Sequence, residues 1–179
     1  MPTGVTLTNP RERLFEAAER VLTRDGPNAL TSRAVTAEAG VAKGVLHKHF
    51  PDFDSFLQEL VQARRADIEM QGAMLLNQVG TGTVAGNVTG ALLAAFGPLT
   101  RAILVLVMSR ESLRRPPGLP LLTEATKMIA AYLAAEPRFG RDPGTTALAL
   151  VGTAHLLFAG RENSPLDVDE LGNAVASLV

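Results

Sequence analysis

Hydrophobic residues recur every three or four positions along most of this 179-residue sequence. The clearest run is Phe53, Phe56, Leu57, Leu60 and Val61, whose spacing is that of an amphipathic helix. No segment alternates convincingly between apolar and polar residues as a β-strand does. The pattern therefore predicts an all-α chain with about nine helices, separated by glycine, proline and short polar residues. The helices are expected over about residues 10–24, 32–39, 42–49, 53–77, 84–96, 98–114, 120–135, 143–159 and 167–178.

Two short helices, 32–39 and 42–49, meet at a turn that contains Gly40. A helix of about eight residues is not stable by itself, so both are expected to pack against the helices on either side. We therefore predict a three-helix, helix-turn-helix domain over residues 1–52. The remaining residues, 53–179, are predicted to form a second helical domain, attached through the long helix at its start.

Composition narrows the classes of protein to consider. Hydrophobic residues make up 46% of the chain, which is enough for a folded core. The absence of Cys excludes a disulfide framework, a Cys-based zinc finger and a thiol nucleophile. The net charge of −1 does not by itself indicate nucleic-acid binding, but the two short helices carry a local basic patch of Arg33, Lys43 and Lys48 against the single acidic residue Glu38.

The second short helix has residue types that suit entry into the DNA major groove. Ala42, Gly44 and Val45 at its leading end are small, which allows a close approach to the base edges. Lys43 and Lys48 are long enough to reach phosphates or guanine edges. The same residues also suit the solvated surface of an ordinary three-helix bundle, so spacing and charge alone leave both interpretations open.

The run from Leu30 to Phe50 strongly resembles the DNA-binding domain of TetR-type transcriptional regulators. Its most specific pieces are Ala39-Gly40-Val41, Lys43-Gly44 and His49-Phe50. The resemblance covers about residues 10–60, and the rest of the chain agrees with the family only in length and helix order.

The resemblance implies a homodimer that binds a double-stranded DNA operator. Thr31 and Arg33 would contact phosphates, Lys48 and His49 would touch the DNA backbone, and Phe50 would lock the helix to the core. The predicted DNA-binding residues are Thr31, Ser32, Arg33, Ala42, Lys43, Gly44, Val45, His47, Lys48 and His49.

Three residues depart from the family pattern. His47 stands where the family usually has a Tyr that meets a phosphate, and Phe53 stands where a phosphate-binding Lys is common. Thr36 replaces a usual Ala in the core. The first two changes remove a hydroxyl group and a charge, and they leave open whether operator affinity is weaker, more pH-sensitive or confined to unusual operators.

The second domain has no convergent set of catalytic residues or metal ligands, and His155 is its only histidine. We therefore expect no enzymatic activity, no metal and no cofactor. A small apolar ligand is expected between its helices, because Met adapts to irregular shapes. The predicted ligand-binding residues are Met70, Met74, Phe96, Met108, Met128, Tyr132 and His155. The same residues at helical spacing also suit an ordinary core, and that interpretation stays open.

The last two helices are predicted to form the dimer interface, two from each subunit. No charged residue lies from Pro143 to Gly160, which favours burial between proteins over an intramolecular core and over a membrane span. The small residues that would allow close approach are Gly144, Ala147, Ala149, Gly152 and Ala154. The larger residues that would be buried are Leu148, Val151, Leu156, Phe158, Leu171, Val175 and Leu178.

The sequence thus favours a sequence-specific DNA-binding transcriptional regulator, expected to be a repressor that a small apolar ligand releases. The alternative is a helical dimeric protein-interaction module that has lost specific operator binding. This alternative is considered because Phe53 stands where the family commonly has a phosphate-binding Lys. The first residues show no basic segment followed by an apolar one, so a signal peptide is not expected and the cytoplasm is the expected location.

Overall fold

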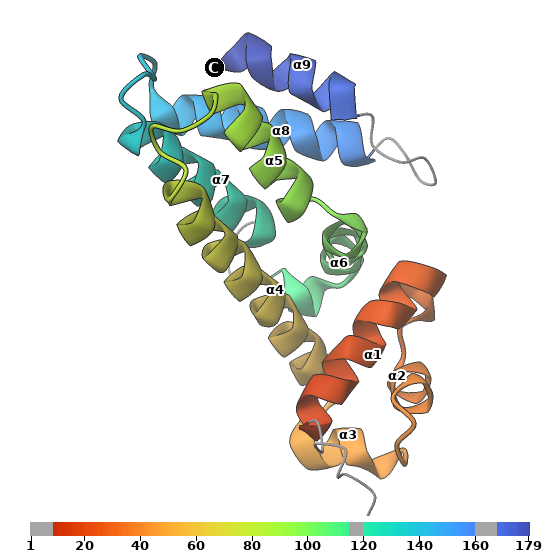
Figure 1. The fold of residues 1–179 in the computed structure, drawn as a ribbon. Helices are drawn as coiled ribbons and strands as arrows, with labels where there is room; N and C mark the ends of the chain where they lie inside the picture. The colour runs from red at the N-terminus through yellow and green to blue at the C-terminus, as the bar shows by residue number, and fades with distance from the viewer. Residues whose placement is uncertain (1–8, 115–119, 160–167) are drawn as a thin grey trace, which may run out of the picture.

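The computed structural model describes residues 9–114, 120–159 and 168–179, and within these ranges the chain is helical, without strands (Figure 1). The nine α-helices of the described residues are α1 (Pro10–Asp25), α2 (Ser32–Glu38), α3 (Gly44–His49), α4 (Phe53–Leu76), α5 (Val84–Ala95), α6 (Pro98–Ser109), α7 (Pro120–Ala135), α8 (Pro143–Ala159) and α9 (Val168–Leu178). Two short 3₁₀ helices, η1 (Pro27–Ala29) and η2 (Glu111–Leu113), follow α1 and α6. The prediction of an all-α chain is confirmed.

Local capping explains why the early helices begin where they do. The side chain of Asn9 accepts a hydrogen bond from the backbone N–H of Arg11, and Pro10 occupies the first helical position of α1. Asp52 caps α4 in the same way by accepting from the N–H of Ser55 at 2.7 Å, and this bond lowers the pKa of the Asp52 carboxyl. Helix α1 ends at Gly26, whose φ of 82° favours glycine.

Helices α1, α2 and α3 pack with the first turns of α4 into an N-terminal bundle (Figure 1). Its centre holds the rings of Phe15, Phe50 and Phe56, with centroids 5.0–5.7 Å apart. Aromatic pairs in such arrangements contribute about 0.5–1.5 kcal/mol each beyond their burial. Leu46, the inward residue of α3, is fully buried and anchors that helix to the bundle.

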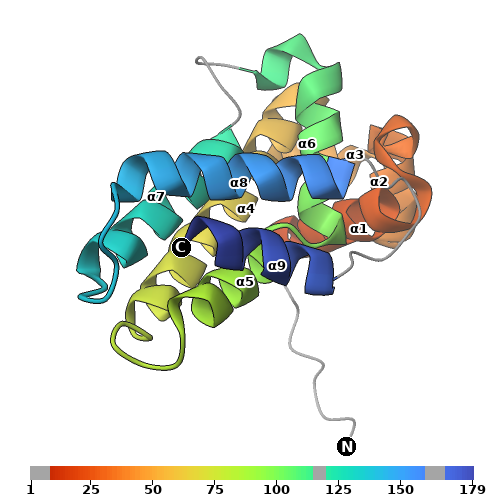
Figure 2. The same ribbon diagram turned by 90° about the horizontal axis from the view of Figure 1, so that it is seen from above.

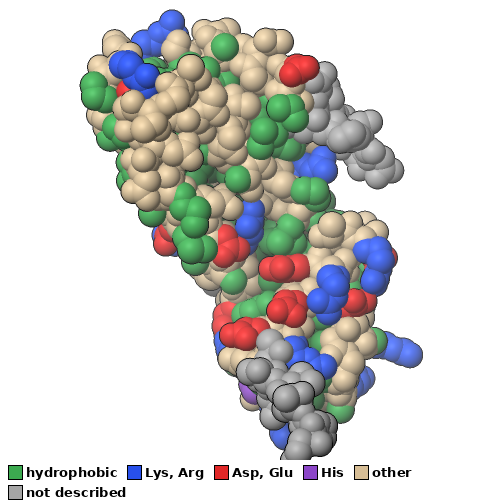
Figure 3. All heavy atoms as spheres, in the orientation of Figure 1, with side chains coloured by type: hydrophobic (Ala, Val, Ile, Leu, Met, Phe, Trp, Pro, Cys, Tyr) green, Lys and Arg blue, Asp and Glu red, His purple; other side chains and the backbone are tan. Residues whose placement is uncertain are grey.

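The 24-residue helix α4 runs out of this bundle into the C-terminal domain. There α7 packs along α4, α8 packs on α7, and α9 lies across α5 and α8. Figure 2 shows α8 and α9 side by side, and Figure 1 places them at the end of the molecule opposite α3. Helix α6 crosses between the two parts and packs against α1. Figure 3 shows charged side chains crowded over the N-terminal bundle, whereas the face of the C-terminal domain in view is mostly uncharged.

Two predicted helices differ in extent from those in the structure. Helix α3 begins at Gly44 rather than near residue 42, because Lys43 precedes it without a side-chain cap. The segment predicted as one helix over 98–114 is broken at Arg110, whose backbone is extended, and it resumes as η2. The other boundaries agree with prediction to within one residue.

No single helix among the described residues is long and apolar enough to cross a membrane. Helices α5 and α6 together reach the required length and composition, but they are bent by 59° at the break between them.

Candidate nucleic-acid interface

Helix α3 presents one continuous outer face. Ala42, Lys43, Gly44, His47 and Lys48 are exposed, whereas Val45 and His49 are partly covered. A Cβ added at Gly44 would meet nothing within 4 Å, so the leading end of the helix stands clear of the rest of the bundle. The structure therefore places these seven predicted DNA-binding residues on or beside one accessible helix surface.

The start of α2 places the other three predicted residues differently. Arg33 is exposed at the surface. The hydroxyl of Thr31 caps α2 by accepting a 3.1 Å hydrogen bond from the N–H of Ala34. The hydroxyl oxygen of Ser32 is shielded from solvent and has no hydrogen-bond partner among the described residues. Of the three side chains, that of Arg33 is therefore the one that is exposed and not engaged in capping or shielded from solvent.

Thr36 shows how the chain accommodates a polar residue in the core of the bundle. The residue is buried, and its hydroxyl donates to the carbonyl oxygens of Ser32 at 2.9 Å and Arg33 at 3.2 Å. Because the buried hydroxyl is satisfied by its own helix, the replacement of Ala leaves no orphan polar group.

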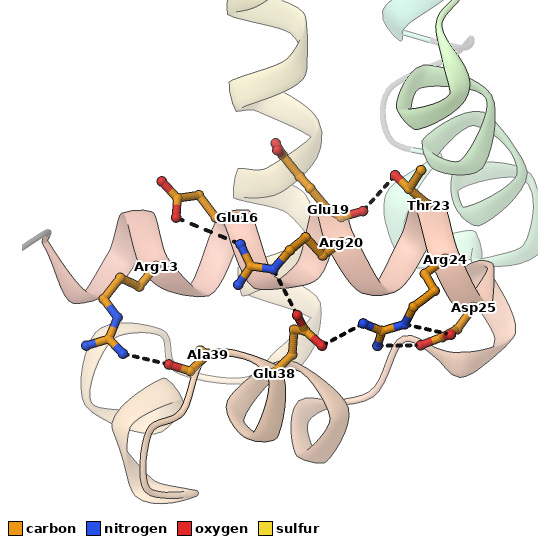
Figure 4. Close-up of polar contacts among 9 residues, drawn as sticks. All are labelled: Arg13, Glu16, Glu19, Arg20, Thr23, Arg24, Asp25, Glu38 and Ala39. Atoms are coloured by element: carbon orange, nitrogen blue, oxygen red, sulfur yellow. Dashed lines mark hydrogen bonds and ion pairs between the residues drawn. The ribbon is translucent and has the colours of Figure 1, made fainter.

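A row of arginines on α1 holds α2 and the turn that follows it (Figure 4). The carboxylate of Glu38 accepts hydrogen bonds from Arg20 at 2.8 Å and from Arg24 at 3.0 Å. These two guanidinium groups lower the pKa of Glu38. Arg13 donates from Nη2 to the carbonyl oxygen of Ala39 at 2.7 Å. Sequence analysis did not identify these positioning residues, and the only signal for them is the repeated arginine on the polar side of α1.

Arg11 fixes the other end of the α3 helix. Its guanidinium donates to the carbonyl oxygen of His49 at 3.0 Å, lies 4.4 Å from the centre of the Phe50 ring, and pairs with Glu59 on α4. One side chain thus joins α1, the last turn of α3 and α4. A cation at the carboxyl end of a helix also interacts favourably with the helix dipole.

Phe53, at the start of α4, is partly buried and stacks on Phe56 with their ring centroids 5.6 Å apart. The guanidinium of Arg110 lies 5.8 Å from the centre of the Phe53 ring and pairs with Asp54 at 3.3 Å. The end of α6 is therefore tied to the first turn of α4.

Residues 14–60 match a family model described as bacterial regulatory proteins, tetR family. The chain has a TetR-family domain at its N-terminus. All of the arginine and α3 contacts described above, except those of residues 11, 13 and 110, fall inside the matched range.

Over nearly its whole length the chain also has the fold of solved TetR-type structures. A TetR family member from Streptomyces coelicolor A3 superposes with a TM-score of 0.72 at 23% identity, covering 96% of this chain and 99% of that one. The reduced form of E. coli NemR gives 0.76 at 17% identity, covering 95% of each chain. The multidrug binding protein EbrR complexed with ethidium gives 0.69 at 23% identity, covering 97% and 99%. No curated protein matches the sequence.

Outside the TetR-family domain, the seven predicted ligand residues do not gather around one cavity. Met70, Met74 and Met108 are each more than half exposed. Phe96 is buried and stacks on Phe158 of α8, and Met128 is also buried. His155 is partly covered. The three methionines therefore lie on the surface in this structure, because the apolar faces of α4 and α6 toward the core are occupied by other side chains.

Tyr132 is fully buried in a polar network. Its hydroxyl accepts from Asn87 at 2.9 Å and donates to Glu136 at 3.3 Å. Glu136 also accepts from the N–H of Gly80 and from Arg138. The network ties the loop between α4 and α5 to the end of α7. Burial raises the pKa of the Tyr132 hydroxyl.

A hollow of about 440 Å³ lies between α4, η2 and the start of α7, and none of the predicted ligand residues lines it. Its lining residues are Gln58, Glu59, Val61, Gln62, Ser112, Leu113 and Pro120. Within the described ranges, no group of three or more His, Asp or Glu residues is placed to hold a metal ion.

The predicted interface residues on α8 divide between two faces. Leu148 and Leu156 are 65% and 73% exposed, and the small residues Gly144, Ala149 and Gly152 are exposed beside them. The residues that pack inside the chain instead are Ala147, Val151, Ala154, Phe158, Leu171 and Val175, with Leu178 partly covered. The outer face of α8 therefore exposes two large apolar side chains, while its inner face packs in the core.

Proposed function

We propose that this protein is a sequence-specific DNA-binding transcriptional regulator that acts as a homodimer. The observation that carries the proposal is the outer face of α3. It is a short helix with a small leading end, held rigidly from α1 and exposed over Ala42, Lys43, Gly44, His47 and Lys48. Such a helix fits the major groove, where base edges can be distinguished.

Each side chain has a proposed role in this arrangement. Gly44 and Ala42 allow the helix to approach the bases, and Lys43 and Val45 contact base edges or the groove wall. Phosphate contacts, which set the register of the protein on the duplex, are proposed for the side chains beside this face, namely Lys48, His49 and Arg33. His47 provides a ring nitrogen for a hydrogen bond. Thr31 and Ser32 contribute to phosphate binding through the backbone N–H groups at the start of α2, since their hydroxyls are occupied or shielded.

The homodimer is proposed to form through α8 and α9. Leu148 and Leu156 expose large apolar side chains around the small residue Gly152, a surface that a second copy of the same helix could cover. Two helices from each subunit would form the interface. The two α3 helices would then enter successive major grooves, about 34 Å apart along the duplex.

We further propose that a small apolar ligand releases the protein from its operator, so that it acts as a repressor in the cytoplasm. Support comes from the largely apolar C-terminal domain and from the relative EbrR, which was solved with ethidium and with malachite green. The ligand would enter between the helices near Phe96, Met128 and Tyr132, which are the buried members of the predicted set. Coupling would follow from a higher affinity of the ligand for the arrangement that does not fit DNA.

Selection of binding sites from a pool of random DNA duplexes tests the function. The expected result is a short sequence present twice in inverted orientation, with centres about one helical turn apart. Equal, weak and strongly salt-dependent binding to every duplex would contradict the proposal. That result would favour the protein-interaction module, because non-specific binding is dominated by phosphate contacts.

A further inference from the structure

Arg64, in the middle of α4, hydrogen-bonds to residues of two other helices. It is only 12% exposed. Its Nε donates a 2.7 Å hydrogen bond to the hydroxyl of Thr100, in the first turn of α6. Its Nη2 donates to the carbonyl oxygens of Ala94 at 3.2 Å and Ala95 at 3.5 Å, at the end of α5. One guanidinium therefore joins α4 to the end of α5 and to the start of α6. We call residues 94–100 the α5–α6 junction.

The chemistry of this contact is specific to arginine. The last carbonyls of a helix have no partner within the helix, and they lie at its negative end. A planar guanidinium can donate to two carbonyls and a hydroxyl at once, whereas the single ammonium of a lysine cannot span the same positions. Thr100 is 1% exposed, so loss of the arginine would leave buried acceptors without their donor.

The other side of the α5–α6 junction contacts α8. Phe96 is buried and stacks on Phe158 of α8, with the ring centroids 5.3 Å apart and the planes 16° from parallel. The guanidinium of Arg101 lies 5.9 Å from the centre of the same Phe158 ring. The junction is thus packed between α4, which leads to the DNA-binding domain, and α8, whose opposite face is the proposed dimer surface.

The N-terminal bundle also contacts this region of the molecule through α1. Helix α6, which begins in this junction, packs against α1, and the charges of Asp67 and Arg64 on α4 act on Glu19 of α1. Burial raises the pKa of Glu19, Asp67 raises it further, and Arg64 opposes both effects. Asp67 in turn pairs with Arg64 at 3.4 Å. Arg64 therefore lies where α1, α4 and the α5–α6 junction meet.

We infer that Arg64 is a positioning residue that fixes the angle of α4 relative to α8, and thereby the separation of the two α3 helices in the dimer. The inference rests on the proposed function and deepens it, because it names the contact that decides which spacing of half-sites the dimer accepts. Arg64 lies far along α4 from α3 and has no role in contacting a single half-site. Its loss should change the preference for spacing and leave the reading of one half-site intact.

The test compares Arg64→Met with Arg65→Met, using duplexes derived from the selected site. One duplex carries a single half-site, and the others carry two half-sites at the selected spacing or at spacings changed by one or two base pairs. Arg65 is the matched control, because it also ties α4 to another helix, pairing with Glu124 of α7 at 3.1 Å, without touching the α5–α6 junction. Thermal unfolding of each variant is measured alongside.

The expected result is that Arg64→Met loses discrimination between the selected and altered spacings by about tenfold, while its affinity for the single half-site stays within about twofold of the original protein. Arg65→Met should keep the original discrimination. Unchanged discrimination in Arg64→Met, or an equal loss in Arg65→Met, would overturn the inference.

If Arg64→Met does not fold, Arg64→Lys decides in its place, since it keeps the charge but cannot donate to the Thr100 hydroxyl and the two carbonyls at once. Loss of spacing discrimination in that variant supports the inference, and retention overturns it. Failure of the original protein to select any paired site is a different outcome, because it contradicts the proposed function itself.

Discussion

Arg13 of α1 reaches across to the turn between α2 and α3, where its Nη2 donates a 2.7 Å hydrogen bond to the carbonyl oxygen of Ala39. The next residue, Gly40, has a φ of 64°. A Cβ at Gly40 would lie 3.8 Å from the same Nη2 atom. Two features therefore set the conformation of the turn before α3. They are the positive φ of Gly40 and the hydrogen bond from the Arg13 guanidinium to Ala39 (Figure 4).

Replacement of Arg13 by Met should loosen this turn. We expect a loss of about 1 kcal/mol in the free energy of unfolding, typical of a partly buried hydrogen bond, together with weaker binding to the selected duplex. Urea denaturation and fluorescence anisotropy measure the two effects. Arg20→Met is the control, because the Arg20 side chain is half exposed and Glu38 keeps its hydrogen bond from Arg24 when Arg20 is replaced. Equal DNA affinity in both variants would contradict the assigned role.

Two glycine substitutions should act in opposite directions on stability. Gly44 lies in α3 with open space around it, so Gly44→Ala should raise the free energy of unfolding by up to about 1 kcal/mol while weakening DNA binding. Gly40→Ala should lower the free energy of unfolding by about 1 kcal/mol, because the φ of 64° at this position is unfavourable for a residue with a Cβ. Thermal unfolding and a binding titration provide both readouts. Tight DNA binding by Gly44→Ala would show that this face does not enter the groove.

The two exposed lysines of the α3 region should contribute differently to DNA binding. Lys48→Ala should weaken binding to all sequences and reduce the slope of log affinity against log salt by about one, as expected for a phosphate contact. Lys43→Ala should instead change which base is preferred at one position of each half-site. Titrations at several salt concentrations, combined with repeated site selection, distinguish the two. If Lys43→Ala selects the same sequence as the original protein, the assignment of the reading face is wrong.

Charge on the outer face of α8 should dissociate the proposed dimer. Leu148 and Leu156 are 65% and 73% exposed in the single chain, so the double variant Leu148→Glu/Leu156→Glu should fold normally and sediment as a monomer. Met74→Glu is the control, since Met74 is 58% exposed and lies on α4, which is not one of the helices of the proposed interface. Sedimentation velocity gives the mass of each form. A double variant that remains dimeric would place the interface elsewhere.

The network around Glu136 should make folding sensitive to acid. The hydrogen bond from Arg138, followed by that from the N–H of Gly80, lowers the pKa of Glu136 from 4.5 to about 2. Because the folded value lies below the unfolded one, this stabilisation is complete above pH 4.5 and is lost as the pH falls toward 2. Glu136→Gln should therefore show a shallower fall in the free energy of unfolding across that interval. Urea denaturation at a series of pH values measures it, and identical slopes would refute this account.

Helix positions were predictable because their signals are local. Asn9, Thr31 and Asp52 each cap a helix by accepting an N–H two or three residues later, a distance that sequence spacing alone specifies. Helix α3 was predicted two residues too long, since nothing in the residues near Lys43 marks where regular helix begins. The exposed face of α3 was likewise predictable, because Leu46 and Phe50 recur at helical spacing and must point inward.

The placement of the methionines shows where local pattern fails. Met70 and Met74 lie one turn apart on α4 and resemble core residues in sequence, yet both are exposed. Which face of α4 is covered depends on how α5 and α7 dock against it, and those helices come from later in the chain.

Caps and apolar periodicity act over a few residues, so the amino-acid sequence is enough to predict an all-α chain, its helix order and a helix-turn-helix segment of the TetR type. The contact of Arg13 with the turn before α3 and the contacts of Arg64 with the α5–α6 junction could not be predicted in this way. Those partners lie 26 and 36 residues away from their arginines, and a hydrogen bond depends on distance in space rather than on separation along the chain.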